Sequence, residues 1–101
     1  MKIPKTYTQF GQIIHIKIDS EYLAKEDCNG LAEPDKNLIT LADENEEHKL
    51  DKEEIERNLI HEMFHIALAK AGYSGAFSDE KFAHTMGNLL YEALKSGKII
   101  R

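Results

Sequence analysis

The chain has 101 residues, a net charge of -5 at pH 7 and one cysteine. A chain of this length forms one domain with a modest core, so we expect residues 1–101 to make a single unit. The negative charge and the scattered lysines and arginines argue against nucleic acid as a partner. No apolar run could cross a membrane, the first residues lack an export signal, and Cys28 alone suits a reducing compartment, so we expect a cytoplasmic protein.

Two strands are expected in the first half of the chain. Residues 12–19 alternate between two faces, and one face is wholly apolar because it carries Ile14, Ile16 and Ile18. The second strand is expected from Asn37 to Ala42, between a turn that contains Pro34 and an acidic run.

Two connecting segments are less regular. Residues 22–28 fit either a short helix capped by Ser20 or a strand that turns at residues 29–30, and the helix is slightly favoured. The acidic run at residues 43–48 is interpreted as a solvated connector that leads into the next element.

A long buried helix is expected over residues 51–71. Asp51 and Glu54 form a capping box at its start, and a glycine directly after it supplies the stop. In between, the helix is apolar around almost its whole circumference, except for a stripe that contains His61 and His65. Two histidines on a buried helix need partners, because an unpaired buried imidazole loses hydrogen bonds.

These histidines belong to the motif His-Glu-Met-Phe-His, which is the HExxH pattern of zinc peptidases. On a helix, His61 and His65 lie one turn apart on one face, so their ring nitrogens can occupy two adjacent corners of a tetrahedral Zn²⁺ site. Glu62 then lies beside the ion, where it can take a proton from a water molecule whose pKa the metal lowers. The alternative is that both histidines are core residues bonded to carbonyls or carboxylates.

A second helix is expected over residues 79–95, with Ser78 as its N-cap and an apolar period over residues 82–93. The short link before it predicts an antiparallel pair with the first helix. Its other face carries Ala83 and Gly87, which have little or no side chain. This face can therefore approach the histidines closely.

The third zinc ligand is expected on this face. Glu80 is the favoured ligand, with His84 one turn further along as its rival and Asp79 as a weaker candidate. If Glu80 binds, His84 becomes a supporting neighbour or a hydrogen-bond donor to the oxyanion that forms when water attacks a carbonyl. Tyr73 and Tyr91 are weaker candidates for that donor.

With HEMFH followed by the stretch Glu-Lys-Phe-Ala at residues 80–83, the chain resembles the small gluzincins. Their third ligand is a glutamate in an ExxA pattern on the helix after HExxH. Within that group the chain is most similar to short phage and prophage HExxH proteins, which are distant relatives of SprT-like proteases and of peptidases that cleave repressors of mobile elements.

The resemblance implies an α+β, zincin-like fold in which a small sheet packs on an antiparallel pair of helices. It implies that zinc is held by His61, His65 and Glu80, and that Glu62 is the general base. It also implies that the strand over residues 37–42 has a free edge, along which a peptide or protein substrate pairs through backbone hydrogen bonds.

Two functions are compatible with these features. The first is a zinc-dependent metallopeptidase, and the second is a catalytically silent, zinc-stabilised protein-binding module of a phage or mobile element, with His84 or Asp79 as a fourth ligand. The enzyme is favoured because a structural site has no need of a glutamate at the second motif position. A zinc endoribonuclease is excluded, because Ala71 stands where that class carries its third histidine.

Overall fold

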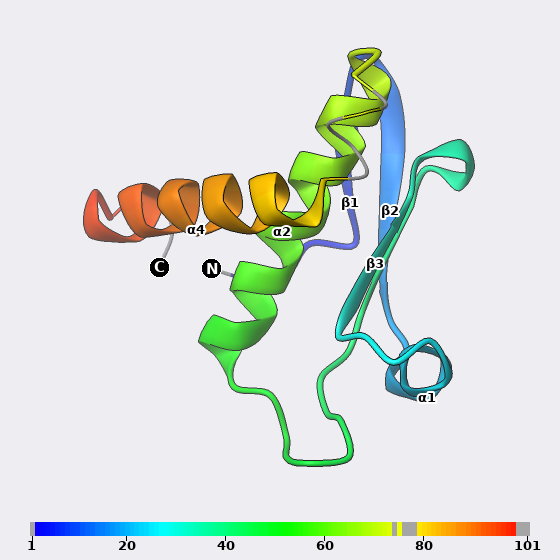
Figure 1. Cartoon of the computed structure of the whole chain (residues 1–101), viewed down its shortest axis with the longest axis vertical. Coiled ribbons are helices and arrows are strands. Elements are labelled where there is room, and N and C mark those ends of the chain that lie inside the picture. The colour runs from blue at the N-terminus through cyan, green and yellow to red at the C-terminus, as the bar shows by residue number, and fades with distance from the viewer. Residues whose placement is uncertain (1, 74, 76–78, 99–101) are drawn as a thin grey trace.

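The structure is a computed structural model and describes residues 2–73, 75 and 79–98. It is a small α+β domain in which a four-stranded mixed sheet packs against α2 (Lys52–Lys70), and α4 (Glu80–Ser96) crosses α2 (Figure 1). Among the described residues, no helix has both the length and the apolar character that a membrane span requires.

The sheet has the strand order β1-β2-β4-β3. Its strands are β1 (Thr6–Gln9), β2 (Gln12–Ile18), β3 (Gly30–Glu33) and β4 (Leu38–Leu41). β2 and β4 are parallel, and the other two pairs are antiparallel. The β1–β2 hairpin turns at Phe10 and Gly11, whose φ angles of 50° and 74° are those of a tight two-residue hairpin loop.

The strand expected at residues 37–42 exists as β4, but the expectation of a free edge there is wrong. β4 is paired on both sides, with β2 and with β3. The outer strands are β1 and β3, and β3 lies next to α2. β3 runs through Gly-Leu-Ala-Glu to η1 (Pro34–Lys36) and has no β-branched or aromatic residue by which a strand is recognised in sequence.

β2 confirms the first expected strand, with one difference. Ile14 and Ile16 are buried in the core, whereas Ile18 is 46% exposed. Ile18 is the last residue of the strand, at the end of the sheet where the chain turns into α1. The apolar face of β2 is therefore covered over only part of its length.

The ambiguous segment is a helix, α1 (Ser20–Lys25), although its cap differs from the expected one. The Asp19 carboxylate accepts the Tyr22 N–H at 3.0 Å and caps the helix. The Ser20 hydroxyl instead donates to the Asp43 carboxylate at 2.6 Å and accepts the Asp43 N–H. Ser20 therefore ties α1 to the acidic connector.

α2 begins as expected, because the Asp51 carboxylate accepts the Glu54 N–H at 2.8 Å. Its buried residues Leu59 and Ile66 pack on the sheet in one core cluster with Ile14, Ile16, Ala32, Ile39 and Leu41. Each fully buried aliphatic side chain of this kind contributes about 1.5–3 kcal/mol relative to exposure. The packing fixes α2, and therefore its histidines, relative to β3.

α4 differs from the expected second helix in its cap and its direction. Asp79 is the N-cap, through a 2.9 Å bond from the Phe82 N–H, and the expected cap Ser78 lies outside the described residues. The helix crosses α2 steeply and is not antiparallel to it (Figure 1). The face towards α2 carries Ala83 and Gly87, whose small size lets the two helix backbones approach closely where they cross.

A buried polar pair anchors the second half of α4. The Tyr91 hydroxyl donates to the Glu56 carboxylate at 2.7 Å, and both side chains are almost fully buried. The Lys95 ammonium lies 3.6 Å from the same carboxylate oxygen, and the Arg57 guanidinium lies 4.6 Å from the centre of the Tyr91 ring. Hydrogen bonding to a buried carboxylate therefore stabilises the α2–α4 crossing.

We expect Tyr91→Phe to lower the free energy of unfolding by about 1.5–3 kcal/mol, the range for a hydrogen bond to a charged group. The substitution keeps the ring but removes a donor from a buried carboxylate. Urea unfolding followed by circular dichroism measures the change. Tyr73→Phe is the matched control, because Tyr73 is 63% exposed and should have almost no effect. Equal effects of the two substitutions would contradict the role of this pair.

Candidate metal site

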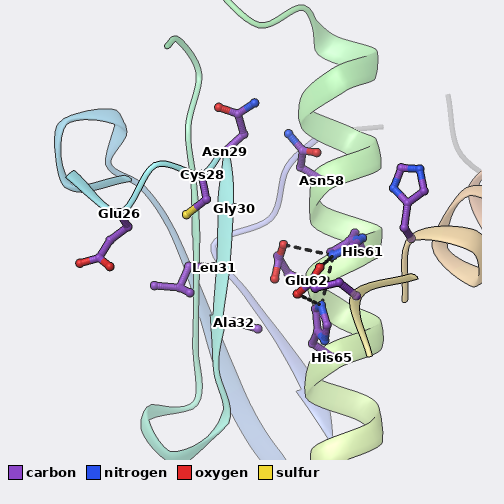
Figure 2. Close-up of a pocket in the computed structure, with 12 residues that line it drawn as sticks. Glu26, Cys28, Asn29, Gly30, Leu31, Ala32, Asn58, His61, Glu62 and His65 are labelled. Carbon is purple, nitrogen blue, oxygen red and sulfur yellow. Dashed lines mark hydrogen bonds and ion pairs between the residues drawn. The ribbon is translucent and has the colours of Figure 1, made fainter. Parts of the chain in front are cut away.

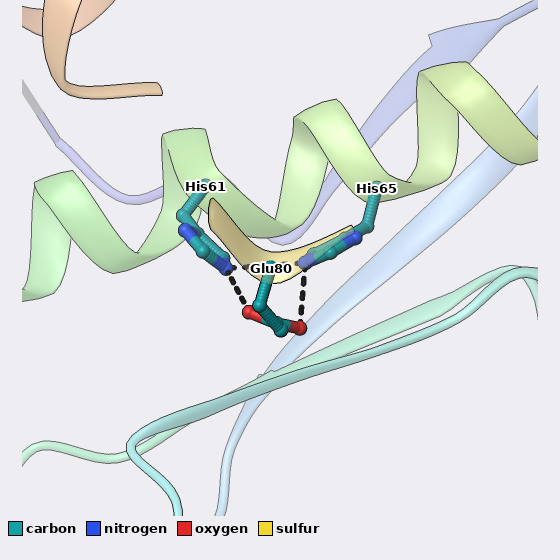
Figure 3. A group of neighbouring side chains, drawn as sticks. All are labelled: His61, His65 and Glu80. Carbon is teal, nitrogen blue, oxygen red and sulfur yellow. Dashed lines mark hydrogen bonds and ion pairs between the residues drawn. The ribbon is translucent and has the colours of Figure 1, made fainter. Parts of the chain in front are cut away.

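Two helices bring three potential metal ligands together. His61 and His65 lie one turn apart on α2, and Glu80 is the first residue of α4 (Figure 3). The Nε2 atoms of the two histidines are 3.1 Å apart. One Glu80 oxygen lies 3.1 Å from His61 Nε2, and the other lies 3.0 Å from His65 Nε2. Among the described residues, this is the one group of three or more potential ligands that could hold a metal ion.

The donor set fits zinc. Imidazole nitrogen and carboxylate oxygen are both common zinc ligands. A tetrahedral ion with ligands at about 2.0–2.1 Å separates neighbouring ligand atoms by about 3.3 Å, close to the 3.1 Å between the two histidine Nε2 atoms. Each Glu80 oxygen lies at a similar distance from one of these two nitrogens. Three protein ligands also leave one corner of a tetrahedron for water or substrate, which is the arrangement of catalytic zinc sites.

Burial and charge keep the histidines ready to bind a cation. His65 is buried and His61 is partly buried, whereas the Glu80 side chain is 75% exposed. Burial and the nearby His65 lower the pKa of His61, and the Glu80 carboxylate only partly opposes them. His61 is therefore neutral near pH 7, which is the form that binds metal.

Glu62 lies beside the ligands but points towards β3. In Figure 2 it stands between the histidines of α2 and the strand that carries Gly30 and Ala32. Its carboxylate is 3.9 Å from His61 Nε2 and accepts the backbone N–H of Ala32. Burial and the Glu80 charge raise the pKa of Glu62 to about 8, so its carboxylate is a stronger proton acceptor than that of an exposed glutamate.

The position of Glu62 depends on a glycine in β3. A Cβ atom on Gly30 would lie 3.0 Å from a carboxylate oxygen of Glu62 and 3.2 Å from its Cγ. Any larger residue at this position would push the carboxylate away from where it now lies. The sequence indicated only a turn at Gly30, because this requirement comes from a residue 32 positions further along the chain.

These residues line one open pocket of about 620 Å³. One wall is α2 with Asn58 and the HExxH residues, and the opposite wall is β3 with the segment before it, including Cys28 and Asn29 (Figure 2). Asn58 and the β3 residues had no sequence signal of function. Asn58 could have been found as the residue three positions before His61, on the same side of the helix.

His84 lies at the edge of this pocket and outside the ligand group. Its ring centre is 6.2 Å from that of His61, and its Nε2 is 3.2 Å from the Asn88 side-chain nitrogen. Asp79, the weakest of the expected ligands, caps α4 instead. Tyr73 and Tyr91 are not among the pocket-lining residues. Of the expected oxyanion donors, His84 alone is placed beside the site in the described part of the chain.

Comparison with protein-family models, with curated proteins and with solved structures finds no match for this chain. The case for its function therefore depends on the geometry of the site.

We expect the purified protein to bind one Zn²⁺ per chain. The variants Glu80→Ala and His84→Ala should show which of these two residues is the third zinc ligand and which only supports the site. Loss of the Glu80 ligand should weaken zinc binding by more than about a hundredfold, whereas loss of a supporting group costs tenfold to a hundredfold at most. His84→Ala should therefore weaken zinc binding by no more than about a hundredfold. Competition with a fluorescent zinc chelator measures both dissociation constants. A larger loss for His84→Ala than for Glu80→Ala would make His84 the ligand, and equal losses would contradict the assignment of the third ligand to Glu80.

Proposed function

We propose that the protein is a zinc-dependent metallopeptidase with a minimal zincin-like core. The observation that carries the proposal is the convergence of His61, His65 and Glu80 beside a buried glutamate and an outer strand. A zinc ion held by the three ligands would supply Lewis acidity, which polarises a peptide carbonyl and lowers the pKa of a water molecule towards neutrality.

Glu62 is the general base in this proposal. Its carboxylate takes a proton from the attacking water while the water oxygen bonds to the carbonyl carbon. The same proton then passes to the amine nitrogen as the carbon–nitrogen bond breaks. The Ala32 N–H holds the carboxylate in place, and the positive charge of a bound zinc ion would favour its ionised form, which accepts the proton. His84, at the pocket edge, is the nearest candidate to donate a hydrogen bond to the oxyanion.

β3 replaces β4 as the strand that aligns the substrate. The Ala42 N–H donates to the Asn29 carbonyl at 3.0 Å, and antiparallel pairing alternates between bonded and non-bonded pairs. The peptide groups of Gly30 and Ala32 therefore point away from β4 and towards the pocket. Because Glu62 takes the Ala32 N–H, an extended peptide along this edge would be held mainly by the Gly30 and Ala32 carbonyls, through backbone hydrogen bonds that tolerate many sequences.

The charge around the pocket favours basic substrates. At its end near Cys28 and Asn29 it adjoins a second, acidic pocket, whose lining includes Asp27, Glu44, Glu46 and Glu47. The residues that line these two pockets, within the described chain, include no lysine or arginine. We therefore propose that the peptide carries basic side chains on the side of the scissile bond that lies over the start of β3.

The binding-module alternative requires a fourth protein ligand that closes the site. The arrangement favours the enzyme, because Asp79 caps α4, His84 contacts Asn88, and the ligand group within the described residues has three members.

We expect Glu62→Gln to keep zinc bound and to lower kcat/KM by at least about a hundredfold, because the amide cannot accept a proton. Cleavage of unfolded casein, with zinc content measured on the same samples, provides the test. Glu21→Gln is the matched control, since Glu21 is exposed on α1 and lines neither pocket. If Glu62→Gln cleaves casein as fast as the parent, the mechanism is wrong. If the zinc-loaded parent shows no cleavage of casein or of a peptide library, the binding module is favoured.

We also expect the double variant Glu46→Lys, Glu47→Lys to lower kcat/KM several-fold for lysine-rich peptides and to leave it almost unchanged for neutral ones. The reason is charge repulsion at the end of the pocket, which weakens with salt. Peptide pairs that differ only in Lys or Gln on one side of the cleavage site measure the effect. Glu21→Lys, which makes a charge change away from both pockets, is the control. Equal losses on both peptide classes would contradict a charge preference.

A further inference from the structure

α4 presents its apolar side outwards. The residues on its outer face are large and exposed: Leu89 by 57%, Phe82 by 41%, Leu90 by 40% and Met86 by 37%. The face that contacts α2 carries Ala83, Gly87 and Tyr91. In a helix that packs only against its own domain, the apolar stripe normally faces the core. Here the face with small side chains makes the close contact with His61, so the large apolar side chains face outwards.

The outer face has the spacing of a helix–helix seam. Phe82, Met86, Leu89, Ala93 and Ser96 follow one another at intervals of four, three, four and three residues, which is the heptad spacing of a two-helix contact. Because α4 crosses α2 steeply, its second half extends beyond α2 and away from the sheet (Figure 1). The seam is therefore accessible to another helix along its length.

We propose that this seam, residues 82–96 of α4, pairs with the α4 of a second copy of the chain in antiparallel orientation. A two-fold axis between Met86 and Leu89 places these two side chains against each other. The same axis places Phe82 against Ala93, so that the largest side chain of the seam meets the smallest apolar one. The same helix face is thus complementary to itself across the two-fold axis.

The charges beside the seam support a second copy as the partner. Lys81 and Glu92 lie on the same side of the seam, one near each end, and both are exposed. In the antiparallel pair, Lys81 of each copy comes alongside Glu92 of the other, so the two-fold axis creates two opposite-charge pairs. A parallel pair would instead place like residues together.

The contact involves one helix per copy, so its total buried area belongs to the small class of interfaces, below about 1,200 Å². We therefore expect a weak dimer with a micromolar Kd. The three zinc ligands and Glu62 lie on α2 or on the side of α4 that faces α2. Dimer formation and zinc binding can thus be tested independently.

Sedimentation equilibrium of the full zinc-loaded chain, from about 1 to 300 µM around the expected micromolar Kd, measures association. The parent should be dimeric at the upper end, and Leu89→Glu should be monomeric throughout. Ile13→Glu is the matched control, because Ile13 is equally exposed on β2, at 58%. It should still dimerise, and circular dichroism checks that both variants are folded. A parent that is monomeric throughout, or equal effects of the two substitutions, would overturn the proposal.

A charge-exchange experiment tests the orientation. Lys81→Glu alone and Glu92→Lys alone should each raise the Kd about tenfold, because each creates two like-charge pairs. An equimolar mixture of the two variants should recover the parent affinity, because each charge pair in a mixed dimer joins a carboxylate on one chain to an ammonium on the other. If each variant weakens association but the mixture gains nothing, the antiparallel arrangement is wrong. If neither variant affects association, the charge pairing is wrong.

Discussion

The structure depends on the close approach of α4 to α2. Gly87 has no side chain to separate it from the backbone of His61, and a Cβ atom there would lie 3.3 Å from His61 Cα. The first turn of α4 is thereby brought near enough for the short Glu80 side chain to reach both histidines. The bond between Tyr91 and Glu56 holds the same crossing at the other end. A small domain thus brings three potential metal ligands together from two helices, through one contact that requires almost no side-chain volume.

The sheet contributes through its outer strand. β3 is short, but its pairing with β4 orients the Ala32 N–H towards Glu62 and the edge towards the pocket. The parallel pair β2–β4 lies behind it and supplies the apolar surface on which α2 packs. Glu62 is therefore positioned by the strand, and the three potential metal ligands by the two helices. Glu62 and the potential ligands meet because α2 packs against both β3 and α4.

The features that sequence could predict are those set by local spacing. The HExxH motif, the Asp51 cap and the period of α2 each depend on residues a few positions apart, so the helix and the place of its histidines were predictable. The position of Glu80 beside the histidines was predictable because Ala83 and Gly87 mark the face of α4 that can approach another helix. The free edge of β3 was not predictable, because this strand has no β-branched or aromatic residue and because strand order depends on pairing between distant segments. The steep crossing of α4 was also missed, because loop length limits the direction of a helix without determining it.

Gly30 gives this fold a position at which the place of Glu62 can change independently of the three potential metal ligands. Its missing side chain makes room for Glu62, whereas none of the three ligands contacts it as closely. An alanine at position 30 would leave the three potential metal ligands in place but displace the Glu62 carboxylate by a few tenths of an ångström, and a larger residue would displace it further. The HExxH letters would be intact in such a chain. In related sequences, position 30 is therefore a guide, independent of the motif, to whether Glu62 keeps its place.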